Sequence, residues 1–170
     1  MSTFIKRIKN LQEPQIQQLA HLVLPLNVPK VVHVERNEMY SERLQAVSIV
    51  DIIKKVSEDY LRIRREIISL ILILHSHGII HGDCHMGNFM IDEAGRIYIV
   101  DFGSAKYLNK RDIELEKADI RLALRELNKW MIYYWLNGEI EYNWMKNHAC
   151  YMKRELTEWS KRNDRLVSYI

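Results

Sequence analysis

Apolar residues recur at helical spacing in five stretches of the chain. These stretches predict helices over Pro14–Leu24, Ala46–Lys55, Glu58–His77, Glu114–Asn137 and Glu141–Arg162. In the third, the run from Ile67 to Leu74 is apolar on every face, so we expect protein to surround it and the helix to be the spine of the core. Ser57 is placed to cap that helix, and Gly78 to end it.

Alternating apolar and polar residues predict short strands between these helices. The segments are Phe4–Lys9, Val31–Glu35, Glu38–Leu44, Phe89–Asp92 and Ile97–Val100. The turn Glu93-Ala94-Gly95 joins the last two segments into a hairpin. Together, the two patterns predict an α+β fold that is predominantly helical.

The composition is that of one globular domain. The chain has 170 residues, 48% of them hydrophobic and 28% charged, which suffices for a single core but is short for a two-lobed enzyme. The net charge of +3 is small and the basic residues are scattered along predicted helix faces, so nucleic acid is not an expected partner. No repeat or linker divides residues 1–170.

Cysteine content and hydropathy predict a soluble cytoplasmic protein without a membrane partner. Cys84 and Cys150 are too few for a disulfide framework, and we expect both to be small core hydrophobes in a reducing compartment. The N-terminus carries charges and lacks the apolar core of a secretory signal. The longest apolar run, Ile67 to Leu74, has eight residues and is too short to span a bilayer.

The candidate chemistry lies between His81 and Gly103. Asp83 and Asn88 are five residues apart on one loop, so one can face a substrate hydroxyl while the other coordinates a metal ion. Asp101 follows the second strand of the predicted hairpin, and a hairpin returns its end to the place where it began, next to Asn88. Two such oxygen ligands, completed by water and phosphate, describe a magnesium site.

This stretch resembles the catalytic core of the protein-kinase-like superfamily. His81-x-Asp83-x-x-x-x-Asn88 is similar to the catalytic loop and Asp101-Phe102-Gly103 to the metal-binding turn, at the family's usual intervals of five and thirteen residues. The form HGDxHxGN is closer to aminoglycoside-phosphotransferase-like and other atypical kinases than to ordinary protein kinases. The resemblance implies ATP and magnesium as cofactors, Asp83 as the catalytic base, and Asn88 and Asp101 as magnesium ligands.

Two positions depart from the ordinary protein-kinase pattern. Gly82 replaces the arginine that binds a phosphorylated activation loop in many of these kinases, which makes that form of regulation unexpected. His85 occupies the position of the catalytic-loop lysine beside the transferred phosphate, where an imidazole can donate a hydrogen bond with a charge that depends on pH.

The resemblance extends more weakly to both sides of the loop. Residues 1–44 resemble a remnant of the small lobe with a hinge from Tyr40 to Leu44 that would hold the adenine, and residues 45–170 resemble a helical large lobe. The sequence contains no GxGxxG, and Lys6 or Lys9 with Glu13 is the only local candidate for the small-lobe lysine and its glutamate. Asp119 matches the aspartate that braces the catalytic loop in this family.

Several interpretations remain open at this stage. The first is a minimal atypical kinase that transfers the γ-phosphate of ATP to a hydroxyl, most simply of a protein Ser or Thr. The second is an inactive large-lobe mimic that binds and regulates a partner kinase, and the third is a small-molecule phosphotransferase. Two alternatives concern the stretch around the predicted loop. Its histidines, His75, His77, His81 and His85, could bind zinc, or Asp83, Asn88 and Asp101 could only cap turns.

Overall fold

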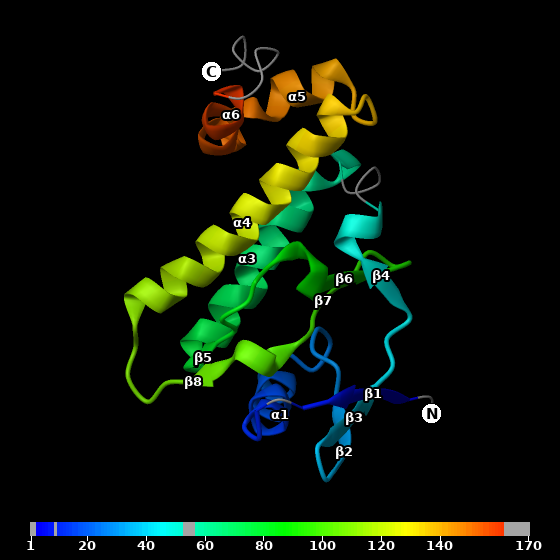
Figure 1. Ribbon diagram of the computed structural model, residues 1–170, viewed down its shortest axis with the longest axis vertical. Helices are drawn as coiled ribbons and strands as arrows, with labels where there is room; N and C mark the ends of the chain where they lie inside the picture. The colour runs from blue at the N-terminus through cyan, green and yellow to red at the C-terminus, as the bar shows by residue number, and fades with distance from the viewer. Residues whose placement is uncertain (1–2, 9, 53–56, 162–170) are drawn as a thin grey trace.

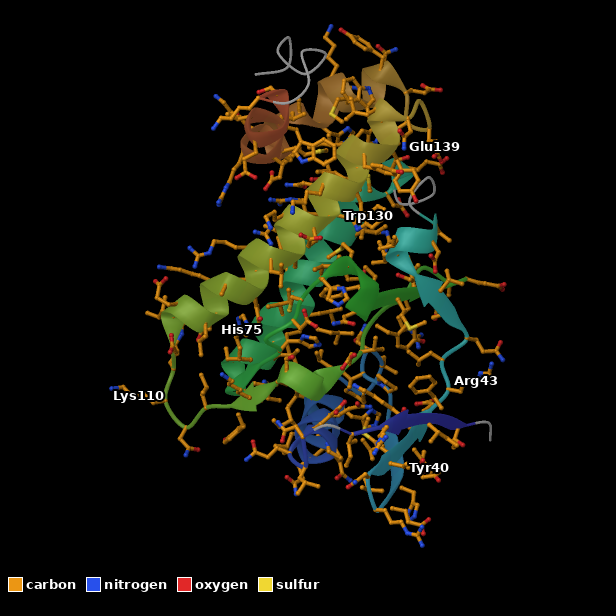
Figure 2. The ribbon with its side chains drawn as sticks, in the orientation of Figure 1. Tyr40, Arg43, His75, Lys110, Trp130 and Glu139 are labelled. Carbon is orange, nitrogen blue, oxygen red and sulfur yellow. The ribbon has the colours of Figure 1, made fainter. Side chains whose placement is uncertain are left out.

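Two long helices run side by side, and the smaller elements lie at their ends and alongside α3 (Figure 1). The computed structural model describes residues 3–8, 10–52 and 57–161. Helices α3 (Tyr60–Ser76) and α4 (Ile113–Leu136) pack against each other in opposite directions, with a small sheet and α1 (Glu13–Val23) near one end. In Figure 2, Tyr40 lies in that small sheet, whereas Trp130 lies on the far half of α4.

The small sheet contains the three strands nearest the N-terminus. Strand β3 (Glu38–Glu42) lies between β1 (Thr3–Arg7) and β2 (Val31–Glu35), and both pairings are antiparallel. The register places Lys6 opposite Met39 and Ile5 opposite Tyr40. Because β1 forms an edge, its other side has no strand partner among the described residues.

Residues 46–52 adopt a different structure from the one predicted. The expected helix over Ala46–Lys55 is wrong, because Ala46–Ser48 form strand β4 and Ile49–Ile52 form the 3₁₀ helix η1, while residues 53–56 lie outside the described part. Strand β4 pairs with β6 (Phe89–Asp92), with Val47 opposite Ile91. Pairing with the apolar hairpin gives this segment sheet hydrogen bonds, which override its helical spacing.

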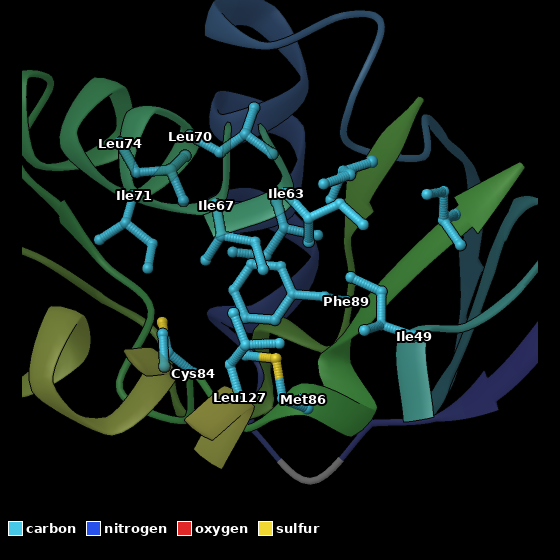
Figure 3. Close-up of a cluster of buried hydrophobic side chains, with 14 of the residues drawn as sticks. Ile49, Ile63, Ile67, Leu70, Ile71, Leu74, Cys84, Met86, Phe89 and Leu127 are labelled. Atoms are coloured by element: carbon cyan, nitrogen blue, oxygen red, sulfur yellow. The ribbon is translucent and has the colours of Figure 1, made fainter. Parts of the chain in front are cut away.

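Helix α3 is the spine of the core, as predicted, but it is not covered on every side. The larger of the two buried apolar clusters contains Phe89 of the hairpin and Leu127 of α4 (Figure 3). Helix α3 contributes Ile63, Ile67, Leu70, Ile71 and Leu74 to this cluster. By contrast, Leu72 and Ile73 are 48% and 38% exposed. The helix begins at Tyr60 with Asp59 rather than Ser57 at its N-cap, and Gly78 after its end has φ of +74°.

The predicted hairpin is present at the centre of the chain. Strands β6 and β7 (Ile97–Ile99) pair with Phe89 opposite Ile99, and β4 extends them to a three-stranded sheet. A separate pair, β5 (Ile79–Ile80) with β8 (Lys106–Tyr107), lies at the end of α3. The short 3₁₀ helices η2 (Met86–Asn88) and η3 (Phe102–Ser104) complete the two loops that contain the predicted chemistry.

The C-terminal region differs from the single helix expected over Glu141–Arg162. It forms α5 (Tyr142–His148), η4 (Ala149–Tyr151) and α6 (Lys153–Ser160). The break lets α5 stack its Trp144 and His148 beside Tyr60 while α6 buries Leu156 against α4. Cys84 is buried as expected, whereas Cys150 is exposed in η4. None of the described helices combines the length and apolarity needed to cross a membrane.

Candidate active site

A buried aspartate of α4 holds the loop that contains Asp83. Asp119 accepts hydrogen bonds from the backbone N–H groups of His81 and Gly82, each at 2.9 Å, and its Oδ2 lies 3.1 Å from His75 Nε2. Burial raises the pKa of Asp119, but the hydrogen bonds lower the pKa by more than burial raises it. The pKa of Asp119 therefore lies below the usual value. Asp119 is therefore an anionic support for the loop.

Gly82 allows the loop to approach the Asp101-Phe102-Gly103 turn closely. Its φ is +77°, and a Cβ atom at this position would lie 2.6 Å from the carbonyl oxygen of Ser104. Both the backbone conformation and the space therefore require glycine. The substitution of arginine by glycine noted in the sequence has this local structural reason.

His81 links the loop to the end of strand β7. Its Nε2 lies 3.0 Å from the carbonyl oxygen of Val100, and its Nδ1 accepts from the N–H of Asp83 at 3.3 Å. These two contacts fit a neutral imidazole protonated at Nε2, and burial lowers the pKa of His81. The ring also packs edge-on against Phe102 at a centroid distance of 5.0 Å.

Acidification is expected to destabilise the protein through His81. In the unfolded chain this histidine takes up a proton below about pH 6.5, whereas in the fold its lowered pKa keeps it neutral to a lower pH. The unfolded state then binds the extra proton, so the free energy of unfolding should fall by up to about 1.4 kcal/mol per pH unit in this window. Urea unfolding at about pH 7 and about pH 5.5 measures the slope. A folded His81→Gln variant with the same slope would contradict the assignment.

Asp83 and Asn88 lie in contact within the loop. The Nδ2 of Asn88 donates to the backbone oxygen of Asp83 at 2.8 Å and lies 3.5 Å from Asp83 Oδ2. Because the amide nitrogen is engaged, Asn88 Oδ1 remains the ligand-forming atom of this side chain. The carboxylate of Asp83 is about half exposed, so an acceptor hydroxyl can reach it.

His85 lies beside Asp83. Its Nδ1 accepts from the N–H of Gly87 at 3.0 Å, which places the ring proton on Nε2, and this atom is 3.6 Å from Asp83 Oδ2. The imidazole thus faces the carboxylate that we expect to receive the substrate proton. Its predicted contact with the transferred phosphate stays a prediction.

Asp101 is held next to the loop by the hairpin. The N–H of Val100 donates to the carbonyl oxygen of Asn88 at 3.0 Å, so the two ends of the hairpin meet. Asp101 adopts a left-handed conformation with φ of 62°, and its Oδ1 accepts from the N–H of Gly103 at 3.2 Å. An aspartate tolerates this conformation because its short side chain can bond to the local backbone.

Lys6 connects this site to the small sheet and to α1. Its Nζ lies 2.5 Å from Asp101 Oδ1 and 2.5 Å from Glu13 Oε1. Burial lowers the pKa of Lys6, but hydrogen bonds to Asp101 and Glu13 outweigh it and raise the pKa above the usual value. For Asp101, burial raises the pKa, and the opposing contact with Lys6 brings it below its usual value. The structure therefore pairs Glu13 with Lys6; Lys9 lies outside the described residues.

A cavity of about 460 Å³ opens between the small sheet and the hairpin. Lys6, Asn88 and Asp101 lie at its polar side, and its apolar lining comes from Phe4, Pro29, Met39, Leu44, Met90 and Val100. Leu44, which the sequence predicts to help hold the adenine, lines this cavity. Tyr40 lies elsewhere, because side chains alternate along β3 and the neighbouring Met39 faces the cavity.

The oxygen atoms in this cavity fit a magnesium ion. Asp101 supplies a carboxylate, and Asn88 supplies an amide oxygen whose own NH₂ group is already used. Magnesium prefers such hard oxygen ligands and keeps water and phosphate in the remaining positions. The four histidines do not share a site: His75 contacts Asp119, His81 contacts Val100, His77 lies 2.9 Å from the carbonyl oxygen of Ile73 and His85 faces Asp83.

The sequence profile of the ABC1 atypical kinase-like domain matches residues 9–131. The chain belongs to the ABC1 atypical kinase-like family. The matched part contains the loop of Asp83, the hairpin, the Asp101-Phe102-Gly103 turn and Asp119. The superfamily resemblance deduced from the catalytic loop is thus confirmed, and the ABC1 assignment narrows it.

Curated relatives of this ABC1 chain include protein kinases. It is 35% identical over 98 residues to the "Probable serine/threonine-protein kinase ndrC" of Dictyostelium discoideum, which is 57% of this chain and 7% of that protein. It is 45% identical over 47 residues to the serine/threonine-protein kinase greatwall of Bos taurus, which is 28% of this chain and 5% of that protein. The chain therefore spans less than a tenth of either relative.

A solved kinase structure supports the fold assignment. The kinase PK-1 of Cydia pomonella granulovirus matches with a TM-score of 0.53 at 16% identity, covering 64% of this chain and 44% of that chain. At this identity the match bears on the fold alone. The predicted α+β fold, with a helical kinase-like lobe and a hairpin, is confirmed.

Several cavity residues were not recognised in the sequence as site residues. Phe4, Met39, Met90 and Val100 look like ordinary strand residues, and only the pairing of β1 with β3 and of β6 with β7 brings them to one cavity. The signal that could have found Met39 is the alternation of β3, since it lies opposite Lys6 in the register. Lys6, by contrast, is already a candidate in the sequence because it lies near Glu13.

Proposed function

We propose that the chain is an atypical kinase that uses Mg-ATP and transfers the γ-phosphate to a hydroxyl, with a protein Ser or Thr as the acceptor. The observation that carries the proposal is the contact of Lys6 with both Glu13 and Asp101 at the polar side of the cavity. It places a cation from the small sheet beside a predicted magnesium ligand, where the phosphates of Mg-ATP would need positive charge. The family and the names of the relatives support kinase chemistry at the coarser level.

Each site residue has a task in this proposal. The apolar lining around Leu44 and Met90 would receive the adenine, and Lys6 would meet the phosphate oxygens, kept in position by Glu13. Asn88 and Asp101 would hold magnesium, which neutralises phosphate charge during transfer. Asp83 is the exposed carboxylate that takes the proton of the attacking hydroxyl, with His85 beside it to orient it.

A second candidate is a kinase-like lobe that binds and regulates another kinase. One observation favours it: Phe4, Ile5, Val32 and Val34 of the small sheet are between 42% and 55% exposed. Phe4 belongs to the cavity lining, whereas Ile5 faces the other side of the sheet, and exposed apolar side chains beside an edge strand are suited to a protein contact. A small-molecule phosphotransferase remains the third candidate, suggested by the HGDxHxGN form of the loop.

Nucleotide binding tests the proposal directly. We expect ATP to bind in the presence of magnesium and to raise the melting temperature by several degrees, since each kcal/mol of binding linkage corresponds to about 2 to 4 °C for a chain of this size. Asp101→Asn should abolish the magnesium-dependent part, because the amide removes the charge that holds the ion. Thermal unfolding measures the shift of the melting temperature, and calorimetric titration of ATP and ADP with and without magnesium measures the binding itself.

Asp51→Asn is the matched control for this experiment. Asp51 is exposed in η1 and does not line the cavity, so the variant should bind nucleotide as the unchanged chain does. Absence of any response to millimolar-range nucleotide would exclude the kinase proposal and favour the regulatory candidate. A response that persists unchanged in Asp101→Asn would remove Asp101 from the magnesium site.

A further inference from the structure

A second hollow, separate from the cavity around Asp101, lies on the helical part of the molecule. It measures about 610 Å³ and is bordered by α3, α4, η4 and α6. Its lining on α4 comes from residues 118–128, and α6 lies toward the end of the long helix pair that is farther from the small sheet (Figure 1). No described residue lines both this groove and the cavity around Asp101. We refer to it as the basic groove.

The basic groove has a strong excess of positive charge. Five cations line it, and Glu155 is the single acidic side chain among the described lining residues, which gives a formal charge of +5 − 1 = +4; the cations are Arg64, Arg121, Arg125, Lys153 and Arg154. Glu155 is buried and accepts a hydrogen bond from Asn128 at 3.0 Å, so it already has a partner within the protein. Three carboxylates outside the lining, those of Glu114, Glu126 and Glu158, partly offset this charge through ion pairs with Arg121, Arg125 and Arg154.

The ion pairs of these cations leave them available to a ligand. Arg121 lies 3.6 Å from Glu114, Arg125 lies 3.6 Å from Glu126 and Arg154 lies 3.5 Å from Glu158, all with exposed or part-exposed side chains. Pairs of this kind contribute about 0 to 1 kcal/mol, so a better placed anion can replace them.

Arg64 provides a cation at the inner side of the groove. Its guanidinium carbon lies 5.6 Å from the ring centroid of Tyr151, which fixes the side chain by a cation–π contact. Its Nε is buried and has no hydrogen-bond partner among the described residues. Arg64 as a whole is only partly buried and lines the groove, so its terminal N–H groups are the ones that can pair with an acceptor there.

The lining is mixed in a way that favours a peptide over other polyanions. Leu122, Leu124 and Tyr151 lie between the arginines, so the groove offers apolar contacts next to its charges. Four of the five cations are arginines, whose planar groups pair with carboxylate or phosphate oxygens through two hydrogen bonds. A membrane surface would need a protruding basic face rather than a hollow, and nucleic acid would need a longer basic track.

From these observations, we infer that the basic groove is a docking site for an acidic, partly apolar segment of a partner protein. The segment would place carboxylate or phosphate groups against Arg121, Arg125 and Arg64 and apolar side chains against Leu122. Docking there needs neither nucleotide nor Asp83, so it stands independently of the proposed phosphoryl transfer.

Fluorescence anisotropy tests the inference with the full chain. The probe is a labelled peptide of about eight residues, alternating Glu and Leu, which measures roughly 25 Å in extended form. We expect saturable binding that weakens as NaCl rises from about 50 mM to about 300 mM, because the pairs are solvent-accessible. Arg121→Glu/Arg125→Glu should weaken binding by about tenfold or more. A phosphoserine version of the peptide tests whether phosphate replaces carboxylate.

Two controls make the result specific to the groove. Lys30→Glu/Lys146→Glu changes the net charge by the same amount at exposed positions outside the groove and should bind the peptide as tightly as the unchanged chain. Lys153→Glu/Arg154→Glu repeats the charge reversal from α6, in case the α4 variant is unstable. Equal weakening by the control pair, or equal binding of a peptide with Gln in place of Glu, would overturn the inference. So would a loss of binding to RNA or anionic vesicles in the groove variants without a loss of peptide binding.

Discussion

Asp83→Asn is expected to lower the rate of phosphoryl transfer by about a hundred- to ten-thousandfold while leaving magnesium-dependent nucleotide binding intact. The amide cannot accept the proton of the attacking hydroxyl, which is the role proposed for the carboxylate. Its shape is retained, and the main bond from Asn88 Nδ2 reaches the backbone oxygen of Asp83 rather than its side chain. The predicted magnesium ligands should therefore keep their positions.

Single-turnover transfer from labelled ATP, with nucleotide titration in parallel, measures this separation of chemistry from binding. Before a substrate is known, autophosphorylation and transfer to Ser- and Thr-containing peptides serve as acceptors. Glu93→Gln is the matched control, since it removes an exposed carboxylate from the turn of the hairpin that follows the loop of Asp83. Transfer at an unchanged rate in Asp83→Asn would show that another group takes the proton or that substrate-assisted transfer operates.

Asp119→Ala is expected to be the most destabilising single substitution in the site, by about 3 kcal/mol or more. The change removes one buried carboxylate that accepts from His81 N–H and Gly82 N–H and contacts His75. Two backbone donors then lose their acceptor, and the loop of Asp83 loses its link to α4. Urea unfolding followed by circular dichroism gives the free energy of unfolding.

Two further variants separate the role of Asp119 from helix stability. Asp112→Ala removes the N-cap of the same helix, where Asp112 Oδ1 accepts from Glu114 N–H and Leu115 N–H, and should cost about 1 kcal/mol without affecting the catalytic loop. Asp119→Asn retains one acceptor oxygen, so its loss of unfolding free energy should lie between those of Asp119→Ala and Asp112→Ala. If Asp119→Ala were no less stable than Asp112→Ala, the loop would be held by other contacts.

The pKa of Asp119 adds a pH test to this pair. Its pKa in the fold is lower than the ordinary value, so its contribution to stability is present above the pKa of the unfolded chain. It is lost as the pH falls through the lower pKa of the folded state. Asp119→Asn should therefore flatten the acid limb of the stability curve, below the window in which His81 acts.

Local patterns were sufficient for most of the chain, and they failed where neighbours in space decide. The helices containing Ile67 and Leu127 and the central hairpin have strong periodicity, because each must bury one face. Ala46–Lys55 has helical spacing too, but hydrogen bonding to β6 draws its first residues into a strand. The expected last helix breaks between α5 and α6 since its two halves pack against different partners.

The sequence by itself determined the loop and the hairpin that carry the proposed chemistry. His81, Asp83, Asn88 and Asp101 lie within one short stretch, and a loop and a hairpin of fixed length place them close together whatever surrounds them. The tertiary structure decided which residues complete the site. Lys6 meets Asp101, 95 positions away, and Met39 rather than Tyr40 faces the cavity, because strand pairing sets these contacts. The basic groove likewise exists only where four separate elements meet, since charge scattered along a sequence becomes a site when packing gathers it.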